Sequence, residues 1–321
     1  MARRSGSPFK GSGIVFAKEF SDHLRSARML VLEWLILLTG IGAVFMAIQG
    51  LRTTTASDPF LFLRLFTDAR EGMPSFLAVL AFLIPLMAIG LGFDSINGEF
   101  NRRTMSRILA QPIYRDALLL GKFWGALATL AVGLVTLWLL IIGLGLLRLG
   151  VAPSGEEVGR GLVFLGIALA YGAVWLSVAM VCSVTCRSPA TAALAALGIW
   201  LLLSLIWPLI ARFIAEIVYP PNELALLLGI PNPQQIGLQA SLARVSPSTL
   251  FGEAVVGMLQ PQTRTFGVVF ANQVQGAVAG APLSFGQSLL LVWPQFTGLI
   301  ASAIVLFAAS YMAFQRQEVR A

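Results

Sequence analysis

The chain has 321 residues, of which 57% are hydrophobic and only 12% are charged. A soluble protein of this length cannot bury so much apolar surface, so the composition excludes ordinary water-soluble domains and predicts helices embedded in a bilayer. The net charge of +7 does not indicate nucleic-acid binding, because Lys and Arg lie mostly in short segments beside apolar runs rather than in one basic stripe.

Six apolar stretches are long enough, at roughly twenty residues each, to cross a membrane as α-helices. They lie at 29–50, 76–93, 123–149, 161–186, 190–218 and 291–314. The sequence therefore predicts an all-α polytopic membrane protein with six transmembrane helices and both termini on one side. Small residues four apart, Ala168 with Gly172 and Ala192 with Ala196, predict close helix packing in the fourth and fifth spans.

The distribution of positive charge orients these spans. One side carries 14 Lys and Arg residues and the other side carries 8. Because loops rich in Lys and Arg stay in the cytoplasm, both termini are expected in the cytosol, with the chain as a multi-pass protein of the cell (inner) membrane. A cleaved signal peptide is not expected, because 28 mostly polar residues precede the first apolar run.

The spans divide the chain into four predicted parts. These are a cytosolic N-terminus at 1–28, five spans at 29–218 that include a cytosolic segment at 94–122, an extracytoplasmic region at 219–290, and a last span with a cytosolic tail at 291–321.

An amphipathic helix is predicted within the first part. Phe16, Phe20 and Leu24 recur every four residues and share one helical face, whereas Lys18 and Arg25 point elsewhere. Such a helix is expected to lie in the membrane interface, in contact with lipid.

Residues that could support catalysis or bind a metal are scarce. The nearest approach to a phosphate-binding loop is Gly121-Lys122, which is followed by Phe123 rather than Ser or Thr. Cys182 and Cys186 share a helical face, but the single histidine is far away in sequence, so they are interpreted as small, reduced packing residues. The sequence therefore predicts no catalytic residue, no metal site and no cofactor in this chain.

Few titratable residues lie within the apolar spans, and the candidates are Glu33, Asp94, Arg212 and Glu216. Arg212 and Glu216 stand four apart on one helix and can pair locally, and Glu33 lies within a turn of the cytosolic end of the first span. Two interpretations stay open for these groups, interfacial or self-paired charges on one hand and polar contacts along a path between helices on the other. Glu33 is the candidate path-lining residue.

The cytosolic segment between the second and third spans is too long for a turn. Glu99, Arg102, Arg103 and Arg107 lie before and within a helical run, and Pro112 breaks that run before a second helix leads into the membrane. The pattern predicts a helical hairpin at the membrane surface. The hairpin either only fixes the topology or docks a cytosolic partner.

This segment resembles the permeases of the type-2 ABC transporter family. In that family a Glu, a spacer, Gly-Thr, a Leu-rich helix, a Pro and an Arg precede Gly-Lys at the third span. The matching residues here are Glu99, Thr104, Ile108, Leu109, Gln111, Pro112, Arg115, Gly121 and Lys122. The family glycine before the threonine is Arg103 in this chain, and Arg prefers a negative φ.

The N-terminus also resembles the helix that runs along the membrane before the first span of these permeases. The residues that carry this likeness are Lys18, Glu19, Phe20 and Arg25. The family resemblance implies an ATP-driven exporter subunit that pairs with a second copy or a close relative and with two separate ATPase subunits. ATP and Mg would be bound by those ATPase subunits. The ATPase-coupling residues that it implies are Glu99, Arg102, Arg103, Thr104, Arg107, Gln111, Pro112 and Arg115.

The outer-side region at 219–290 holds 7 of the 16 prolines but only four charged residues. Ser246-Pro247 predicts a capped helix start with Pro in the first turn. Short helices over the outer mouth are expected, as a gate, a dock for an extracytoplasmic protein or a mere insertion. Two further functions therefore stay open beside export. These are a mechanical relay to such a protein, as in relatives that help mature metalloenzymes, and an ATP-independent secondary transporter or scaffold.

Overall fold

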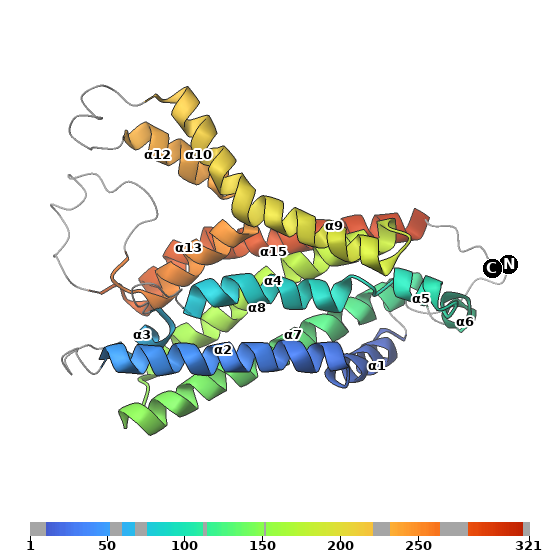
Figure 1. Cartoon of the computed structure of the whole chain (residues 1–321), viewed down its shortest axis with the longest axis horizontal. Coiled ribbons are helices and arrows are strands. Elements are labelled where there is room, and N and C mark those ends of the chain that lie inside the picture. Colours follow the sequence, from blue (N-terminus) through green and yellow to red (C-terminus); the bar gives the residue numbers. More distant parts are fainter. Residues whose placement is uncertain are drawn as a thin grey trace.

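The computed structural model describes residues 11–51, 60–67, 76–111, 114–150, 152–220, 232–263 and 282–316. Every regular element in these ranges is a helix, and the long helices form an elongated bundle (Figure 1). Five helices of the described ranges are long and apolar enough to cross a membrane, and α2 (Ala27–Leu51) contributes the shorter apolar stretch Met29–Gly42. The all-helical membrane architecture is confirmed, and a sixth span stays a prediction.

The predicted spans correspond to helices in the expected order. They are α2, α4 (Phe76–Gly92), α7 (Arg115–Leu149), α8 (Gly155–Thr185), a fifth span made of α9 (Pro189–Leu201), η1 (Leu202–Ile206) and α10 (Trp207–Val218), and α15 (Phe285–Arg316). The shorter helices are α1 (Ser12–Leu24), α3 (Leu61–Thr67), α5 (Asn97–Asn101), α6 (Met105–Ala110), α12 (Pro233–Ala243) and α13 (Pro247–Leu259).

The helix α8 lies at the centre of the bundle. It packs against α15, α4, α13 and α7, and its Tyr171 and Trp175 side chains are fully buried. Gly172 permits a close approach, because a Cβ added there would lie 2.2 Å from Cδ2 of Leu130. Ala168 is also fully buried, so the predicted close packing at Ala168 and Gly172 is confirmed.

The fifth span is not a uniform helix. Ala192 and Ala196 are fully buried where α9 meets the bundle, as their spacing predicted. The π-helical turn η1 follows, and beyond it α10 packs mainly on α12 and diverges from the other helices (Figure 1). The charges Arg212 and Glu216 form a local ion pair on α10, which bears out the local-pairing interpretation.

The helix α13 lies inside the bundle, beside α8. Ser248, in the first turn of α13, lies 2.9 Å from the Tyr171 hydroxyl near the middle of α8. The far end of α13 meets the first turns of α8, because apolar residues such as Phe251 and Met258 bury α13 inside the bundle. The predicted helix start at Pro247 is confirmed, but the Ser246 side chain makes no capping hydrogen bond.

One end of the bundle gathers α1, α5, α6, the start of α7 and the end of α15 (Figure 1). The Arg115 guanidinium lies 5.9 Å from the centroid of the Phe314 ring, and Gln315 donates a hydrogen bond to Asp116. These contacts join the last turn of α15 to the first turn of α7. Most residues of the predicted coupling segment lie at this end.

Candidate functional site

Two glycines of α7 allow α1 to pack closely against it. A Cβ on Gly121 would lie 2.6 Å from Cβ of Val15, and a Cβ on Gly125 would lie 2.9 Å from Cβ of Glu19. The backbones of the two helices can therefore approach closely only because these positions lack side chains. Val15 and Glu19 form the buried face of α1, while Phe16 and Phe20, stacked on each other, are only partly buried.

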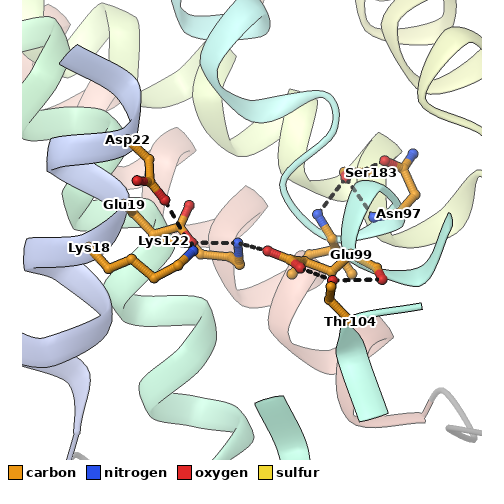
Figure 2. A network of polar contacts seen from close by, with 9 residues as sticks. Lys18, Glu19, Asp22, Asn97, Glu99, Thr104, Lys122 and Ser183 are labelled. Atoms are coloured by element: carbon orange, nitrogen blue, oxygen red, sulfur yellow. Dashed lines mark hydrogen bonds and ion pairs between the residues drawn. The ribbon is translucent and has the colours of Figure 1, made fainter. Parts of the chain in front are cut away.

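Lys122 bridges α1 and α5 from the start of α7. Its Nζ lies 2.8 Å from Oε1 of Glu19 and 3.2 Å from Oε1 of Glu99 (Figure 2). The Lys122 side chain is only 3% exposed. A buried ammonium is strongly disfavoured without partners, so the two carboxylates are needed to keep this charge inside the protein.

Glu99 also organises the turn between α5 and α6. Its carboxylate accepts a hydrogen bond from the Thr104 hydroxyl (Figure 2), and its backbone carbonyl accepts one from the Thr104 N–H at 2.9 Å. Arg103, just before Thr104, has φ of 55° and is the one non-glycine residue of the described ranges with a positive φ. The backbone therefore adopts at Arg103 a left-handed conformation that suits the family glycine, despite the preference of Arg for negative φ.

A second polar contact joins α5 to the end of α8. The Ser183 hydroxyl accepts hydrogen bonds from the Ile96 and Asn97 N–H groups at 3.0 and 3.3 Å (Figure 2). The Asn97 side chain accepts a bond from Ser183 and donates one, at 3.5 Å, to the Cys186 carbonyl. Both Asn97 and Ser183 are almost fully buried.

The arginines of the α5–α6 turn face outward. Arg102, Arg103 and Arg107 are exposed, as is Gln111. Of the predicted coupling residues, therefore, Glu99 and Thr104 hold the turn from within, and these arginines form its surface. Arg115 is partly buried against Phe314, and Pro112 lies outside the described residues.

A polar cavity of about 380 Å³ separates the end of α1 from the α4–α5 connection. Its lining is mixed in charge and consists of Lys18, Glu19, Asp22, His23, Arg25, Ser26, Asp94, Ser95, Gly98, Glu99, Arg102 and Lys122. Partial burial acts to lower the pKa of Lys18, but the carboxylates of Glu19 and Asp22 outweigh that effect and raise the pKa above its ordinary value. Lys18 therefore stays charged at the edge of the cavity.

Glu33, the candidate path-lining residue, is partly buried on α2 and does not line this cavity. Within the described ranges no group of His, Cys, Asp and Glu is arranged to hold a metal ion, and Cys182 and Cys186 are free thiols.

The sequence predicted Glu19, Glu99 and Thr104 as site residues but did not predict which residues they contact. Lys122 was noted only as part of a motif, and Asn97 and Ser183 were missed. The available signal was a single lysine between Gly121 and Gly125 at the start of an apolar span, which is typical of a close helix contact with a buried charge.

Comparison with known proteins agrees with this arrangement. The profile of the family described as "ABC-2 family transporter protein" matches residues 14–319, which is nearly the whole chain. The chain belongs to the ABC-2 family of transporter proteins.

Two curated relatives of this ABC-2 protein carry the same printed name, "Probable ABC transporter permease protein NosY". The relative from Stutzerimonas stutzeri is 30% identical over 228 residues, which cover 68% of this chain and 76% of the relative. The relative from Pseudomonas aeruginosa is 29% identical over 198 residues, covering 60% of this chain and 66% of that protein. This ABC-2 protein is thus a multi-pass membrane permease of the ABC transporter type, and permeases of that type work with an ATPase partner.

Proposed function

We propose that this chain couples ATP hydrolysis on a separate ATPase to the export of a substrate across the inner membrane. Two permease copies, identical or closely related, would associate with two ATPase subunits that bind ATP and Mg. The bundle end that carries α1, α5 and α6 would face the cytosol, together with both termini.

The geometry of the α5–α6 turn carries this proposal. Lys122 fixes the turn to α1 and α7 through Glu19 and Glu99, so that a force on the turn moves three elements together. The exposed Arg102, Arg103 and Arg107 give its surface a positive charge that would pair with carboxylates of an ATPase. A hairpin that only fixed the topology would not need a buried lysine paired with two carboxylates to hold it in place.

The substrate would pass between helices of the two copies. Few polar side chains lie in the spans, which favours an amphipathic or lipid-like cargo. Glu33 on α2 would supply a polar contact along that path.

Affinity purification from native membranes in mild detergent tests the coupling function. The tagged wild-type chain should retain a cytosolic P-loop ATPase, and a variant with residues 99–115 scrambled should lose it while still inserting into the membrane. If the wild type retains no ATPase, the coupling function is wrong and an ATP-independent transporter or scaffold becomes the better hypothesis.

A mechanical relay to an extracytoplasmic protein is the second candidate. The position of α13 favours the relay, because α13 reaches Tyr171 near the middle of α8. Movement of the bundle would then be passed directly to the outer region that adjoins α13. The same purification distinguishes the relay from the exporter. A relay requires that the wild type also retains an extracytoplasmic protein. A variant with residues 219–231 and 264–281 replaced by Gly/Ser sequence should release that protein.

A further inference from the structure

The end of α8 caps the start of α5. Ile96 is the N-cap residue of α5, and its own side chain has no oxygen with which to cap the helix. The Ser183 hydroxyl takes that place, accepting the N–H groups of Ile96 and Asn97. The first turn of α5 therefore depends on a hydroxyl that belongs to α8.

The first turns of α8 hold two more helix ends at the opposite end of the bundle. The Glu157 carboxylate accepts the Phe62 N–H at 2.8 Å, in the first turn of α3. The Arg160 guanidinium donates to the Met258 carbonyl at 2.9 Å, in the last turn of α13. A negative group at a helix N-terminus and a positive group at a C-terminus are both favoured by the helix dipole.

Arg160 also fixes the start of α15. It donates to the Leu283 carbonyl at 2.7 Å and to the Ser288 hydroxyl at 2.9 Å, and it pairs with Glu156 at 2.8 Å. The Arg160 side chain has no exposed surface. The outer group is defined as α3, α13 and residues 283–288. Glu157 and Arg160 attach it to the first turns of α8, and α13 also contacts the middle of α8 through Tyr171, which bonds Ser248 and stacks on Phe251.

Between these two attachments α8 runs without interruption. Its 31 residues contain no proline and span about 46 Å. Three other spans contain a feature that favours bending, which is Pro85 inside α4, Pro294 inside α15 and the π-turn η1 in the fifth span. Prolines and π-turns are the usual sites of helix kinks, so α8 is better suited than these three to carry a displacement along its length.

We propose that α8 acts as a connecting rod that transmits displacement of the α5–α6 turn to the outer group. The idea rests on the proposed function, because the force enters through the turn that would dock the ATPase. It goes further by assigning the transmission to Ser183 at one end of α8 and to Glu157 and Arg160 at the other. Movement of the coupling turn would shift α8 as a rigid body and carry α3, α13 and the start of α15 with it.

Hydrogen–deuterium exchange on the purified permease–ATPase complex tests the rod. The complex in lipid nanodiscs is compared without nucleotide and with ATP, Mg and orthovanadate. In the wild type, nucleotide should change exchange in both α5–α6 and α13. Arg160→Gln should retain the ATPase and the response at α5–α6 but lose the response at α13. Ser183→Ala should raise the exchange of α5 in both states, because the helix loses its cap, and should retain the ATPase and the response at α6 but lose the response at α13.

Each variant has a matched control. Within the described residues, the hydroxyl that Thr185→Ala removes bonds only carbonyls of its own helix, at Val181 and Cys182. Arg148→Gln removes an exposed arginine from the outer end of α7. Both controls should respond to nucleotide as the wild type does. If Arg160→Gln does not fold, Ser183→Ala decides the question alone.

Three outcomes overturn the rod. An α13 response that persists in Ser183→Ala would show that the displacement takes another route. A wild-type complex that responds at α5–α6 but not at α13 would also refute it, while leaving the coupling function intact. A wild-type chain that retains no ATPase would refute the coupling function and the rod together.

Discussion

Nζ of Lys122 lies 2.8 Å from Oε1 of Glu19, so the third span and the N-terminal helix share one nearly buried charge pair. The two residues are 103 positions apart in the sequence. Glu99 adds a second carboxylate at 3.2 Å, which makes Lys122 the meeting point of α1, α5 and α7.

Removing this cation should destabilise the protein. Lys122→Met takes the buried cation away from two carboxylates, which leaves Glu19 with the exposed Lys18 and Glu99 with the Thr104 hydroxyl, and we expect the free energy of unfolding to fall by about 3 kcal/mol. Lys18→Met is the control, because the Lys18 side chain is 59% exposed and its ion pairs are worth less than about 1 kcal/mol. Thermal unfolding of the purified proteins in detergent measures both. Equal losses would contradict the role assigned to Lys122.

The left-handed backbone at Arg103 predicts opposite effects for two neighbouring glycine variants. Arg103→Gly removes a strain of about 1 kcal/mol, so stability should be unchanged or slightly higher. Arg102→Gly should lose about 0.5–1 kcal/mol, because Arg102 has φ of −80° and gains nothing from glycine. The comparison uses the same thermal unfolding measurement. A larger loss for Arg103→Gly than for Arg102→Gly would show that the conformation is not strained.

The contact between α1 and α7 should not tolerate a side chain at Gly121. Gly121→Ala would place its Cβ 2.6 Å from Val15 and 2.9 Å from the Ser12 carbonyl oxygen, and overpacking of this kind costs about 1–3 kcal/mol. Trypsin should then cleave α1 at Lys18 and Arg25 faster than in the wild type. Gly143→Ala is the control, since no atom outside its own helix backbone lies within 4 Å of a Cβ there. An equal cleavage rate in both variants would argue against the close packing.

Reversing the charge of Arg102, Arg103 and Arg115 should uncouple ATP hydrolysis from transport without preventing insertion. Arg102 and Arg103 form the exposed surface of the turn, whereas Arg115 also contacts Phe314. Each Arg→Glu variant is reconstituted with its ATPase, and substrate moved per ATP is measured. Unchanged coupling in all three would remove the docking hypothesis for these residues.

Stability should depend on the buried Arg160 far more than on Arg148, an exposed arginine at the end of α7. Arg160→Gln leaves Glu156 and two backbone carbonyls without their cation, and we expect a loss of about 3–5 kcal/mol. Arg148→Gln should change stability by less than about 0.5 kcal/mol. Chemical denaturation of the two variants measures their free energies of unfolding. A small loss for Arg160→Gln would contradict the prediction, because it would mean that water can take the place of the guanidinium.

The sequence by itself determined the membrane class, the helix order and the position of the short helices between the apolar helices α4 and α7. A bilayer leaves the backbone no alternative to helices at such apolar composition, so spans such as those at 76–93 and 190–218 could be located within a few residues. The start of α13 followed from Ser246-Pro247 because helix starts are governed by local backbone chemistry.

Only the tertiary structure decided which of these residues meet. The pairing of Glu19 with Lys122, the capping of α5 by Ser183 and the burial of α13 beside Tyr171 each join segments far apart in sequence. Hydropathy and residue spacing describe each helix separately. Because almost every helix in a membrane is apolar on all sides, these patterns do not predict which helices pack together. The choice of partner then depends on small residues, buried charges and free helix ends, whose geometry exists only once the bundle has assembled.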